Sequence, residues 1–371
     1  MQNHTGELSR GLDRRGVTQM IVTTRPPTAP RVEDFGARGR VVRLGLPVPW
    51  ARQLYSLPAS RLVPRLAASA DLIHAHLGED LAVVPIALFA ARRHRLPFVL
   101  TVHTSLHHTI TVTNPRSALL KILGGRLERW GASEADALIA ITRRLAELVM
   151  ADGVPPERVH LVPPGVQPAL FARAAADGDL LADLPRPRVL YLGRFHAQKQ
   201  VDVLVRAASL LPEAQVVLVG DGNERHALEL LSKRLGVSER VHFRGFVPHD
   251  QIPGVLRGAD VLALPSRYEE LGVVMLEAMH AGVPVVASAT GGIVDVVEHE
   301  INGLLVPPGD HEALAMALRR VLTDSNLADS LAAAGRQRVT RYDWNGLTEE
   351  VLTIYEQVLR RHVPGTPNVG K

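Results

Sequence analysis

The strongest indication of the fold is the segment VLALPSRYEELGVVMLEAMHAGVPVVASA, residues 261–289. It begins with a short apolar run, Val261–Leu264, passes through a polar loop into a helical stretch, Val273–Ala281, and ends in a second run, Val283–Ala287. Continuous apolar runs of this length are typical of strands that helices cover on both faces of a parallel sheet. The segment therefore predicts a strand–helix–strand unit.

The same alternation extends to both sides of this segment. In the second half, further strands are expected at Val189–Leu192, Gln215–Val219 and Val241–Phe243, with helices at Val201–Leu211 and Glu224–Leu235. The first half repeats the theme with shorter runs at Met20–Thr23, Val41–Leu44, Leu72–His74, Phe98–Val102 and Ala137–Ile141. A length of 371 residues suggests about two domains. We predict an α/β protein with two Rossmann-like, doubly wound parallel-sheet domains.

A Pro-, Ala- and Asp-rich stretch, residues 163–187, is typical of a linker. We predict domains at residues 1–168 and 182–339 on its two sides. A last helix, at about Gly346–Arg361, follows the second sheet. We expect residues 340–371 to return to the first domain and complete it.

Composition excludes several classes of protein. There is no cysteine, which excludes disulfides, thiolate catalysis and cysteine metal sites. The formal net charge is only +4, because basic and acidic residues are nearly equal in number. A nucleic-acid-binding protein usually carries a concentrated basic stripe instead. No run approaches the roughly 20 apolar residues that span a bilayer, and no signal peptide is evident. We expect a cytoplasmic enzyme that can touch a membrane surface.

The N-terminus begins unusually for a doubly wound domain. Residues 2–15 are typical of a helix, with Leu8 and Leu12 on one face, whereas such a domain normally opens with a strand and a Gly-rich turn. We therefore expect the reading frame upstream of residue 1 to encode an apolar strand followed by a Gly-rich turn.

Two carboxylates stand eight residues apart around a predicted helix start. Glu269 lies in the loop after a strand, and Glu277 lies about two turns into the helix that begins near Gly272. Free amides at such a helix start, here those of Val273 and Val274, bind phosphate well, while carboxylates accept hydrogen bonds from sugar hydroxyls. The same residues are equally consistent with acids placed near a helix N-terminus for its dipole.

A second segment is Gly193-Arg194-Phe195-His196-Ala197-Gln198-Lys199, directly after the first strand of the second half. Arg194 offers a planar fork and Lys199 a point charge, and both suit a diphosphate. Taken alone, these residues could equally be two solvated cations on a loop.

Together, the two segments resemble glycosyltransferase family 4, of the GT-B fold. The family pattern is Gly-Arg-x4-Lys, followed about 75 residues later by Glu-x7-Glu, and it is matched by Gly193, Arg194, Lys199, Glu269 and Glu277. "LVGDGNE", "VHFRGFVP", "EAMHAGVPVVAS" and "NGLLVPPGD" also match in order. The resemblance implies two domains around a cleft, a nucleotide-sugar donor and a hydroxylated acceptor. We expect no metal or other cofactor, because Arg194 and Lys199 can neutralise the diphosphate.

The resemblance also implies how the donor is held. Arg194, Lys199 and the amides of Val273 and Val274 would bind the diphosphate. The amides of Leu271 and Gly272 would hold hydroxyls of the transferred sugar. Two residues near these positions depart from the family pattern. Glu270 stands where many relatives have a small residue or Pro, and Gln200 stands where a Gly is usual.

The remaining donor contacts follow from the same resemblance. Glu277 would hydrogen-bond the ribose, and Glu269 would face the transferred sugar as one of two catalytic residues. The other part of the donor is the base, whose pocket would be lined by Gly245, Phe246 and Val247.

In the first half, His103 of "VLTVHTSLHH" matches the second catalytic residue of the family, a histidine beside the transferred sugar. His107 and His108 follow at four and five residues, a spacing that can serve a metal on a helix. Because nothing else supports a metal centre, and residues 177–179 (Asp-Gly-Asp) lie in the linker rather than at a strand end, we expect none.

The acceptor is expected near "DLIHAHLGED", where His76, Glu79 and Asp80 follow a strand into a loop. The resemblance implies retention of the anomeric configuration. The abrupt start and "EELG" are similar to transferases that decorate aminocyclitol antibiotics, and UDP-glucose and UDP-N-acetylglucosamine are the favoured donors. Two alternatives remain, namely a GT-B sugar-nucleotide epimerase and a non-catalytic nucleotide-sugar-binding protein.

Overall fold

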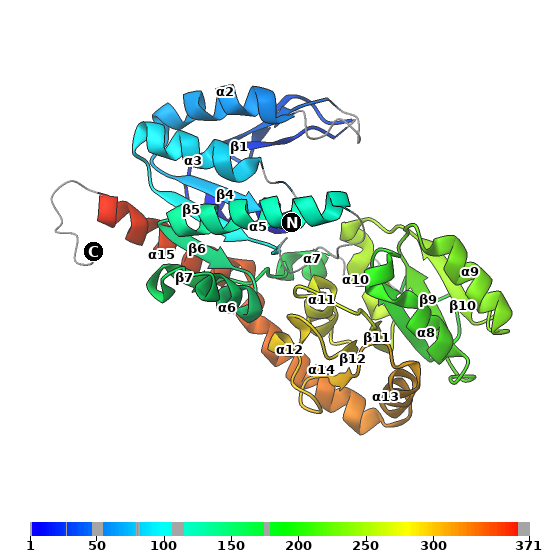
Figure 1. The fold of residues 1–371 in the computed structure, drawn as a ribbon. Helices are drawn as coiled ribbons and strands as arrows, with labels where there is room; N and C mark the ends of the chain where they lie inside the picture. Colours follow the sequence, from blue (N-terminus) through cyan, green and yellow to red (C-terminus); the bar gives the residue numbers. More distant parts are fainter. Residues whose placement is uncertain are drawn as a thin grey trace. The chain divides into compact units, whose positions relative to one another are not determined.

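The computed structural model describes residues 2–26, 28–46, 55–78, 80, 82–105, 115–173 and 179–362 (Figure 1). The chain forms two compact units, residues 1–163 with 344–371, and residues 164–343. The predicted linker is not a free connection, because Pro168–Arg173 forms helix α7 and Leu181 is buried in the core of the second unit. Its apolar residues anchor this stretch to that unit.

The second unit is built on one parallel sheet of six strands in the order β10-β9-β8-β11-β12-β13. The strands are β8 (Arg188–Leu192), β9 (Gln215–Val219), β10 (Val241–Gly245), β11 (Val261–Leu264), β12 (Val285–Ser288) and β13 (Leu304–Val306). This is the doubly wound order, and the chain reverses direction across the sheet between β8 and β11. The predicted Rossmann-like fold is confirmed here.

Helices cover both faces of this sheet, as continuous apolar strands require. Val189 and Tyr191 of β8 pack into one core and Leu190 into the other, because successive side chains of a strand point to opposite faces. The helices are α8 (Val201–Ala208), α9 (Arg225–Arg234), α10 (Ile252–Arg257), α11 (Val273–Ala281), α12 (Ile293–Val296), α13 (His311–Thr323) and α14 (Ser325–Val339).

The strands of the first unit form two sheets, where a single one was predicted. The parallel sheet β4-β5-β6-β7 contains Ile73–Leu77, Phe98–Val102, Ala137–Ala140 and Val159–Leu161. The other sheet has the order β1-β3-β2 and contains Gln19–Thr24 (β1), Val32–Phe35 (β2) and Gly39–Leu44 (β3), with β2 antiparallel to β3. Among the described residues, no strand joins β1 to β4. The expected upstream strand stays a prediction.

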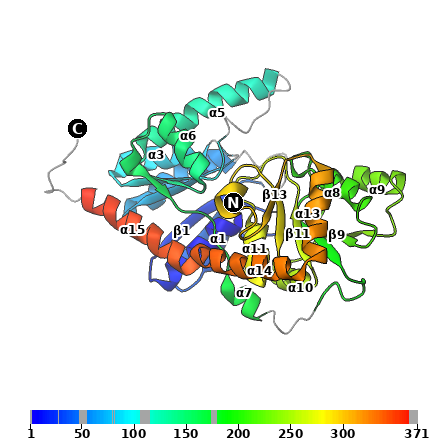
Figure 2. The same cartoon turned by 90° about the horizontal axis from the view of Figure 1, so that it is seen from below.

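Helix α15 (Trp344–His362) belongs to the first unit, together with α1 (Gln2–Arg14). The two helices lie against each other, and Leu8, Leu12 and Trp344 share a core with Val99 of β5 (Figure 2). The other helices of this unit are α2 (Ser56–Leu66), α3 (Val83–His94), α5 (Pro115–Glu134) and α6 (Arg143–Ala151). Helices α3 and α6 pack in one core with β4 and β5, whereas α1 and α15 pack in a separate core on the other face of this sheet.

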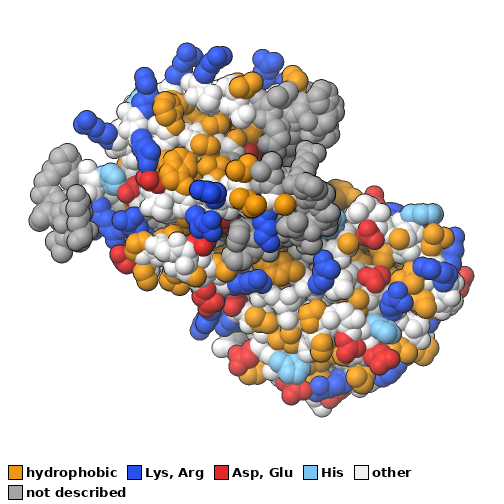
Figure 3. Space-filling view, in the orientation of Figure 1, with side chains coloured by type: hydrophobic (Ala, Val, Ile, Leu, Met, Phe, Trp, Pro, Cys, Tyr) orange, Lys and Arg blue, Asp and Glu red, His pale blue; other side chains and the backbone are white. Residues whose placement is uncertain are grey.

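The exposed surface mixes charge and apolar side chains. On the face seen in Figure 3, Lys and Arg side chains stand among Asp and Glu over the second unit. In the first unit, Phe89 of α3 and Ile122, Leu123 and Trp130 of α5 are exposed. Of the helices in the described ranges, none combines the length and the apolar character needed to span a bilayer.

Candidate active site

Glycines end three neighbouring strands of the second unit. The N–H of Gly193 after β8 donates to the carbonyl of Val219 (3.0 Å), and that of Gly220 after β9 donates to the carbonyl of Gly245 (2.7 Å). A Cβ on Gly220, whose φ is +136°, would stand 1.9 Å from the carbonyl oxygen of Gly193. Only glycine fits at position 220, so the backbone itself forms this carboxyl edge of the sheet. A ligand phosphate can approach such a backbone closely.

The two predicted charged motifs meet at the switch point of the sheet. Lys199 ends a short turn after β8, Glu269 lies in the loop after β11, and Lys199 Nζ lies 2.5 Å from Glu269 Oε1. Ser266, which is fully buried, donates its hydroxyl to the same oxygen at 3.4 Å. The N–H of Arg267 donates to the carbonyl of Gln198 (2.9 Å), which joins the two loops. Ligands of doubly wound sheets bind at this position.

Backbone contacts fix Glu269 beside the start of helix α11. Its carbonyl accepts the N–H of Gly292 at 3.0 Å, and a Cβ on Gly291 would stand 1.8 Å from that carbonyl oxygen. Gly272, with φ +80°, ends the loop and caps the helix, whose first turn begins at Val273 and Val274. The first N–H groups of a helix have no partner within it, and they carry partial positive charge. A carboxylate, a cation and a helix start thus lie together.

Glu277 is buried in the second turn of α11, with 7% of its surface exposed. Burial raises its pKa from 4.5 to about 7, because a charged carboxylate loses its hydration there. The ring of His249 lies beside it, with Nδ1 3.8 Å from Glu277 Oε1. A buried carboxylate held at this cost is typical of a binding site rather than of a stabilising contact.

Glu277→Gln is expected to stabilise the unliganded protein at pH 8. Since the folded-state pKa is raised, the protonated form favours folding, and the destabilisation grows as pH rises from 4.5 through about 7. A shift of this size corresponds to on the order of 3 kcal/mol, so we expect a gain of about 1–3 kcal/mol in the free energy of unfolding at pH 8 and a much smaller one at pH 5. Urea denaturation at both pH values measures it.

Glu312→Gln, at an exposed position of α13, is the matched control and should show no such pH dependence. A Glu277→Gln variant that is destabilised at pH 8, or changed equally at both pH values, would contradict the raised pKa.

The other predicted donor residues lie along the same edge. The Arg194 side chain is exposed, and its backbone carbonyl accepts the hydroxyl of Tyr191 at 3.0 Å, which fixes the start of the loop. Gly245 has a φ of +69°, the following Phe246 is 80% exposed, and Val247 packs against the core. An exposed aromatic ring on a core-anchored turn is suited to stacking against a planar base.

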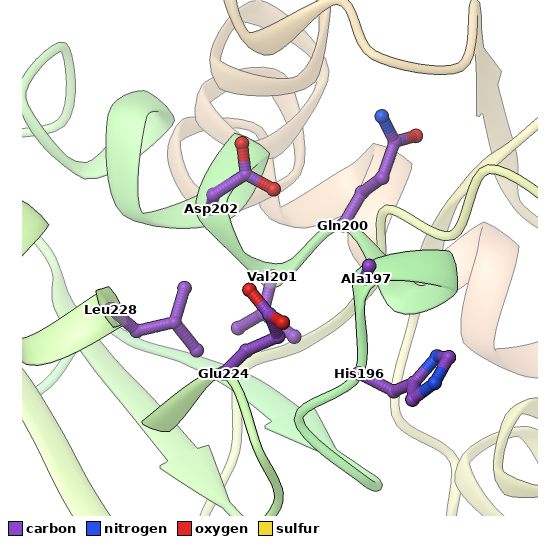
Figure 4. Close-up of a pocket in the computed structure, with 7 residues that line it drawn as sticks. All are labelled: His196, Ala197, Gln200, Val201, Asp202, Glu224 and Leu228. Carbon is purple, nitrogen blue, oxygen red and sulfur yellow. The ribbon is translucent and has the colours of Figure 1, made fainter. Parts of the chain in front are cut away.

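A small pocket opens beside this edge, between the turn after β8 and helix α9 (Figure 4). It is lined by His196, Ala197, Gln200, Val201, Asp202, Glu224 and Leu228. Its volume of about 20 Å³ holds roughly one water molecule. A nucleotide sugar therefore does not fit in this pocket.

In the first unit, the structure brings His76 and His103 together. His76 Nδ1 lies 3.1 Å from His103 Nε2, and the N–H of His103 donates to the carbonyl of Leu77 at 2.9 Å. Burial lowers the pKa of His103 and lowers that of His76 to about 4, so both rings are neutral near pH 7. Asp80 accepts the N–H of Ala82 at 3.0 Å, just before α3. Glu79, His107 and His108 lie outside the described residues.

Sequence reasoning missed His4 and His74, which lie beside these two rings. The ring centroid of His4 is 4.7 Å from that of His103, and the centroid of His74 is 4.3 Å from that of His76. The repeat His-Ala-His over residues 74–76 was a signal for two imidazoles on one strand face, but nothing in the sequence connects His4 to them.

The comparisons with known proteins agree with this arrangement. The family model described as Glycosyltransferase Family 4 matches residues 1–170, and the model described as Glycosyl transferases group 1 matches residues 173–338. Each match corresponds closely to one of the two α/β units. A doubly wound sheet with a cation, a carboxylate and a helix start at its switch point is a Rossmann-like unit, and both family models describe glycosyltransferases.

Two curated relatives match nearly the whole chain. The 2-deoxystreptamine glucosyltransferase of Streptomyces kanamyceticus is 33% identical over 387 residues, covering 97% of this chain and 99% of that protein. The D-inositol 3-phosphate glycosyltransferase of Xylanimonas cellulosilytica is 33% identical and covers 96% and 91%. A solved structure, sucrose-phosphate synthase from Thermosynechococcus elongatus, has a TM-score of 0.80 at 29% identity and covers 96% and 92%. The chain belongs to family 4 of the GT-B glycosyltransferases.

Proposed function

We propose that this glycosyltransferase transfers a hexose from a UDP-sugar, glucose or N-acetylglucosamine, to a hydroxyl of a small cyclitol acceptor, with retention of the anomeric configuration. The cyclitol is supported by the names of the two relatives, whose acceptors are 2-deoxystreptamine and inositol 3-phosphate. An aminocyclitol is favoured, because the match to the 2-deoxystreptamine enzyme covers 97% of this chain and 99% of that protein, whereas the match to the inositol 3-phosphate enzyme covers 96% and 91%.

The meeting of Lys199, Glu269 and the start of α11 at the switch point of the second unit carries the proposal. Arg194 and Lys199 would bind the diphosphate, together with the amides of Val273 and Val274. The Lys199 ammonium pairs with the Glu269 carboxylate in the structure, and a diphosphate, which carries more negative charge than one carboxylate, would attract the same ammonium.

In the proposed reaction, the bond between the anomeric carbon and the diphosphate oxygen breaks, and the acceptor oxygen bonds to that carbon from the same face. The acceptor proton passes to the leaving diphosphate, whose growing charge is stabilised by the two cations and the helix dipole. Glu269 and the amides of Leu271 and Gly272 would hold the sugar, and Glu277 the ribose. The role of His103 beside the transferred sugar stays a prediction.

A screen of UDP- and GDP-sugars by thermal denaturation tests the donor. A ligand present at about 100 times its Kd adds about 2.7 kcal/mol of stability, which corresponds to roughly 5–10 °C for a domain of this size. We expect this shift with a UDP-sugar and a much smaller one with its GDP counterpart. A larger shift with GDP-sugars would overturn the assignment of UDP.

Turnover is expected to survive EDTA. Arg194 and Lys199 supply the positive charge that a divalent cation would otherwise bring to the diphosphate. The rate of UDP release, measured before and after addition of excess EDTA, should change by less than about twofold. Complete loss, restored by Mg²⁺ or Mn²⁺, would show that the charge on the leaving group is balanced by a metal instead.

A further inference from the structure

A cluster of histidines lies between the β4–β5 sheet and helix α1 in the first unit. His74 and His76 are two residues apart in strand β4, so their side chains point to the same face of the sheet. Thr101 of β5 pairs with His76 and shares this face. His103 directly follows β5 and stands two residues after Thr101, so its ring also lies on this face, beside that of His76. Helix α1, which packs on this face, brings His4 of its first turn against His103.

Three of these rings have nitrogens that converge. The ligand atoms of His4, His76 and His103 all lie within 4.8 Å of one another. The separation of 3.1 Å between His76 Nδ1 and His103 Nε2 is close to the roughly 3.3 Å between two nitrogens on one tetrahedral Zn²⁺, given Zn–N bonds of about 2.0–2.1 Å. The His4 nitrogen lies within 4.8 Å of the other two ligand atoms, and it has to move closer for all three to bind one ion.

His4 also has an unused nitrogen. Its Nδ1 is buried, and no hydrogen-bond partner for it exists among the described residues. His4 is buried, with 7% of its surface exposed, and its ring contacts Trp344 edge to face. An unsatisfied buried polar atom costs about 1–3 kcal/mol. A metal ion bound by His4 through this nitrogen would give it a partner.

The fourth histidine is a neighbour and not a ligand. His74 Nδ1 lies 2.6 Å from the hydroxyl of Tyr355, and its Nε2 lies 2.7 Å from the hydroxyl of Thr101. Both ring nitrogens are therefore occupied. The converging set is three neutral imidazoles, which is a donor set for Zn²⁺, Cu²⁺, Ni²⁺ or Co²⁺ rather than for Mg²⁺ or Ca²⁺.

We propose that His4, His76 and His103 bind one transition-metal ion of the zinc type, and that the bound ion inhibits the transferase by holding the His103 ring. The inhibition, unlike the binding, rests on the proposed function, in which a free His103 acts beside the sugar. The site adds no metal to the reaction, and it is consistent with turnover in EDTA.

Calorimetric titration of the untagged, EDTA-treated chain with ZnCl₂ tests the site directly. We expect one ion per chain, and Co²⁺ in its place should give the visible absorption of a four- or five-coordinate complex. His4→Ala and His76→Ala should each weaken zinc binding by at least about tenfold, as loss of a direct ligand costs no less than loss of an outer-shell partner. His74→Asn, at the neighbouring position, should change it by less than about threefold.

The cobalt spectrum of the unmodified chain does not depend on any variant folding. An octahedral Co²⁺ spectrum, absence of stoichiometric zinc binding, or binding that is unchanged in both ligand variants would overturn the site. Zinc should inhibit turnover at the concentration where it binds, and His4→Ala should require at least about tenfold more zinc. Stoichiometric binding without inhibition would overturn the role of His103 alone, while a chain without any transferase activity would leave the calorimetric result standing.

Discussion

Lys199→Ala is expected to lower kcat/KM for the nucleotide sugar by about a hundredfold to a thousandfold. The ammonium would contact the diphosphate and stabilise the charge that develops as it leaves, and loss of one such preorganised donor costs about 2.7–4 kcal/mol in the transition state. The variant also leaves the Glu269 carboxylate without its 2.5 Å ion-pair partner. Steady-state kinetics with the donor varied at saturating acceptor measures the effect.

Two variants make this test specific. Lys233→Ala removes an exposed lysine in the last turn of α9 and should leave kcat/KM unchanged. Lys199→Arg keeps the charge but replaces a point charge with a planar fork, so we expect partial activity. If Lys199→Ala and Lys233→Ala behaved alike, the diphosphate would not be bound at this position.

Glu269→Ala is expected to lower kcat by about a hundredfold while KM changes by less than about fivefold. A residue that faces the transferred sugar acts mainly in the transition state, and its loss therefore appears in kcat. Glu277→Ala should show the opposite division, because a contact to the ribose is made in the ground state and in the transition state alike. Initial rates over a range of donor concentrations separate kcat from KM.

Glu269→Gln helps to separate charge from shape. The amide keeps the size of the side chain and can still accept the Ser266 hydroxyl, so a loss of kcat in this variant reports the lost negative charge. Equal effects on kcat and KM in Glu269→Ala and Glu277→Ala would contradict the two roles.

The sequence was sufficient to predict both site motifs, but not their contact. Lys199 and Glu269 are separated by 70 residues, and nothing in that spacing states that β8 and β11 are neighbours. The strand order is a property of the whole sheet, which depends on how six strands and their helices pack together. The raised pKa of Glu277 was hidden for the same reason, since burial is decided by distant parts of the chain.

The first unit was harder to predict, because its local patterns are weaker. Strand β2, Val32–Phe35, has three exposed residues out of four and lacks the apolar run that marks the strands of the second unit. Its place depends on pairing with β3 rather than on its own composition. His4 likewise gained its neighbours only through the packing of α1 against the sheet.

Transfer to an acceptor is measured by UDP release from UDP-glucose or UDP-N-acetylglucosamine with and without 2-deoxystreptamine. We predict that UDP is released only when donor and acceptor are both present, that an α-linked product forms from the α-linked donor, and that Lys199→Ala largely abolishes both. Isomerisation of the donor without acceptor would identify an epimerase, and donor binding without any release of UDP would identify a binding protein. Either result would contradict the proposed transfer.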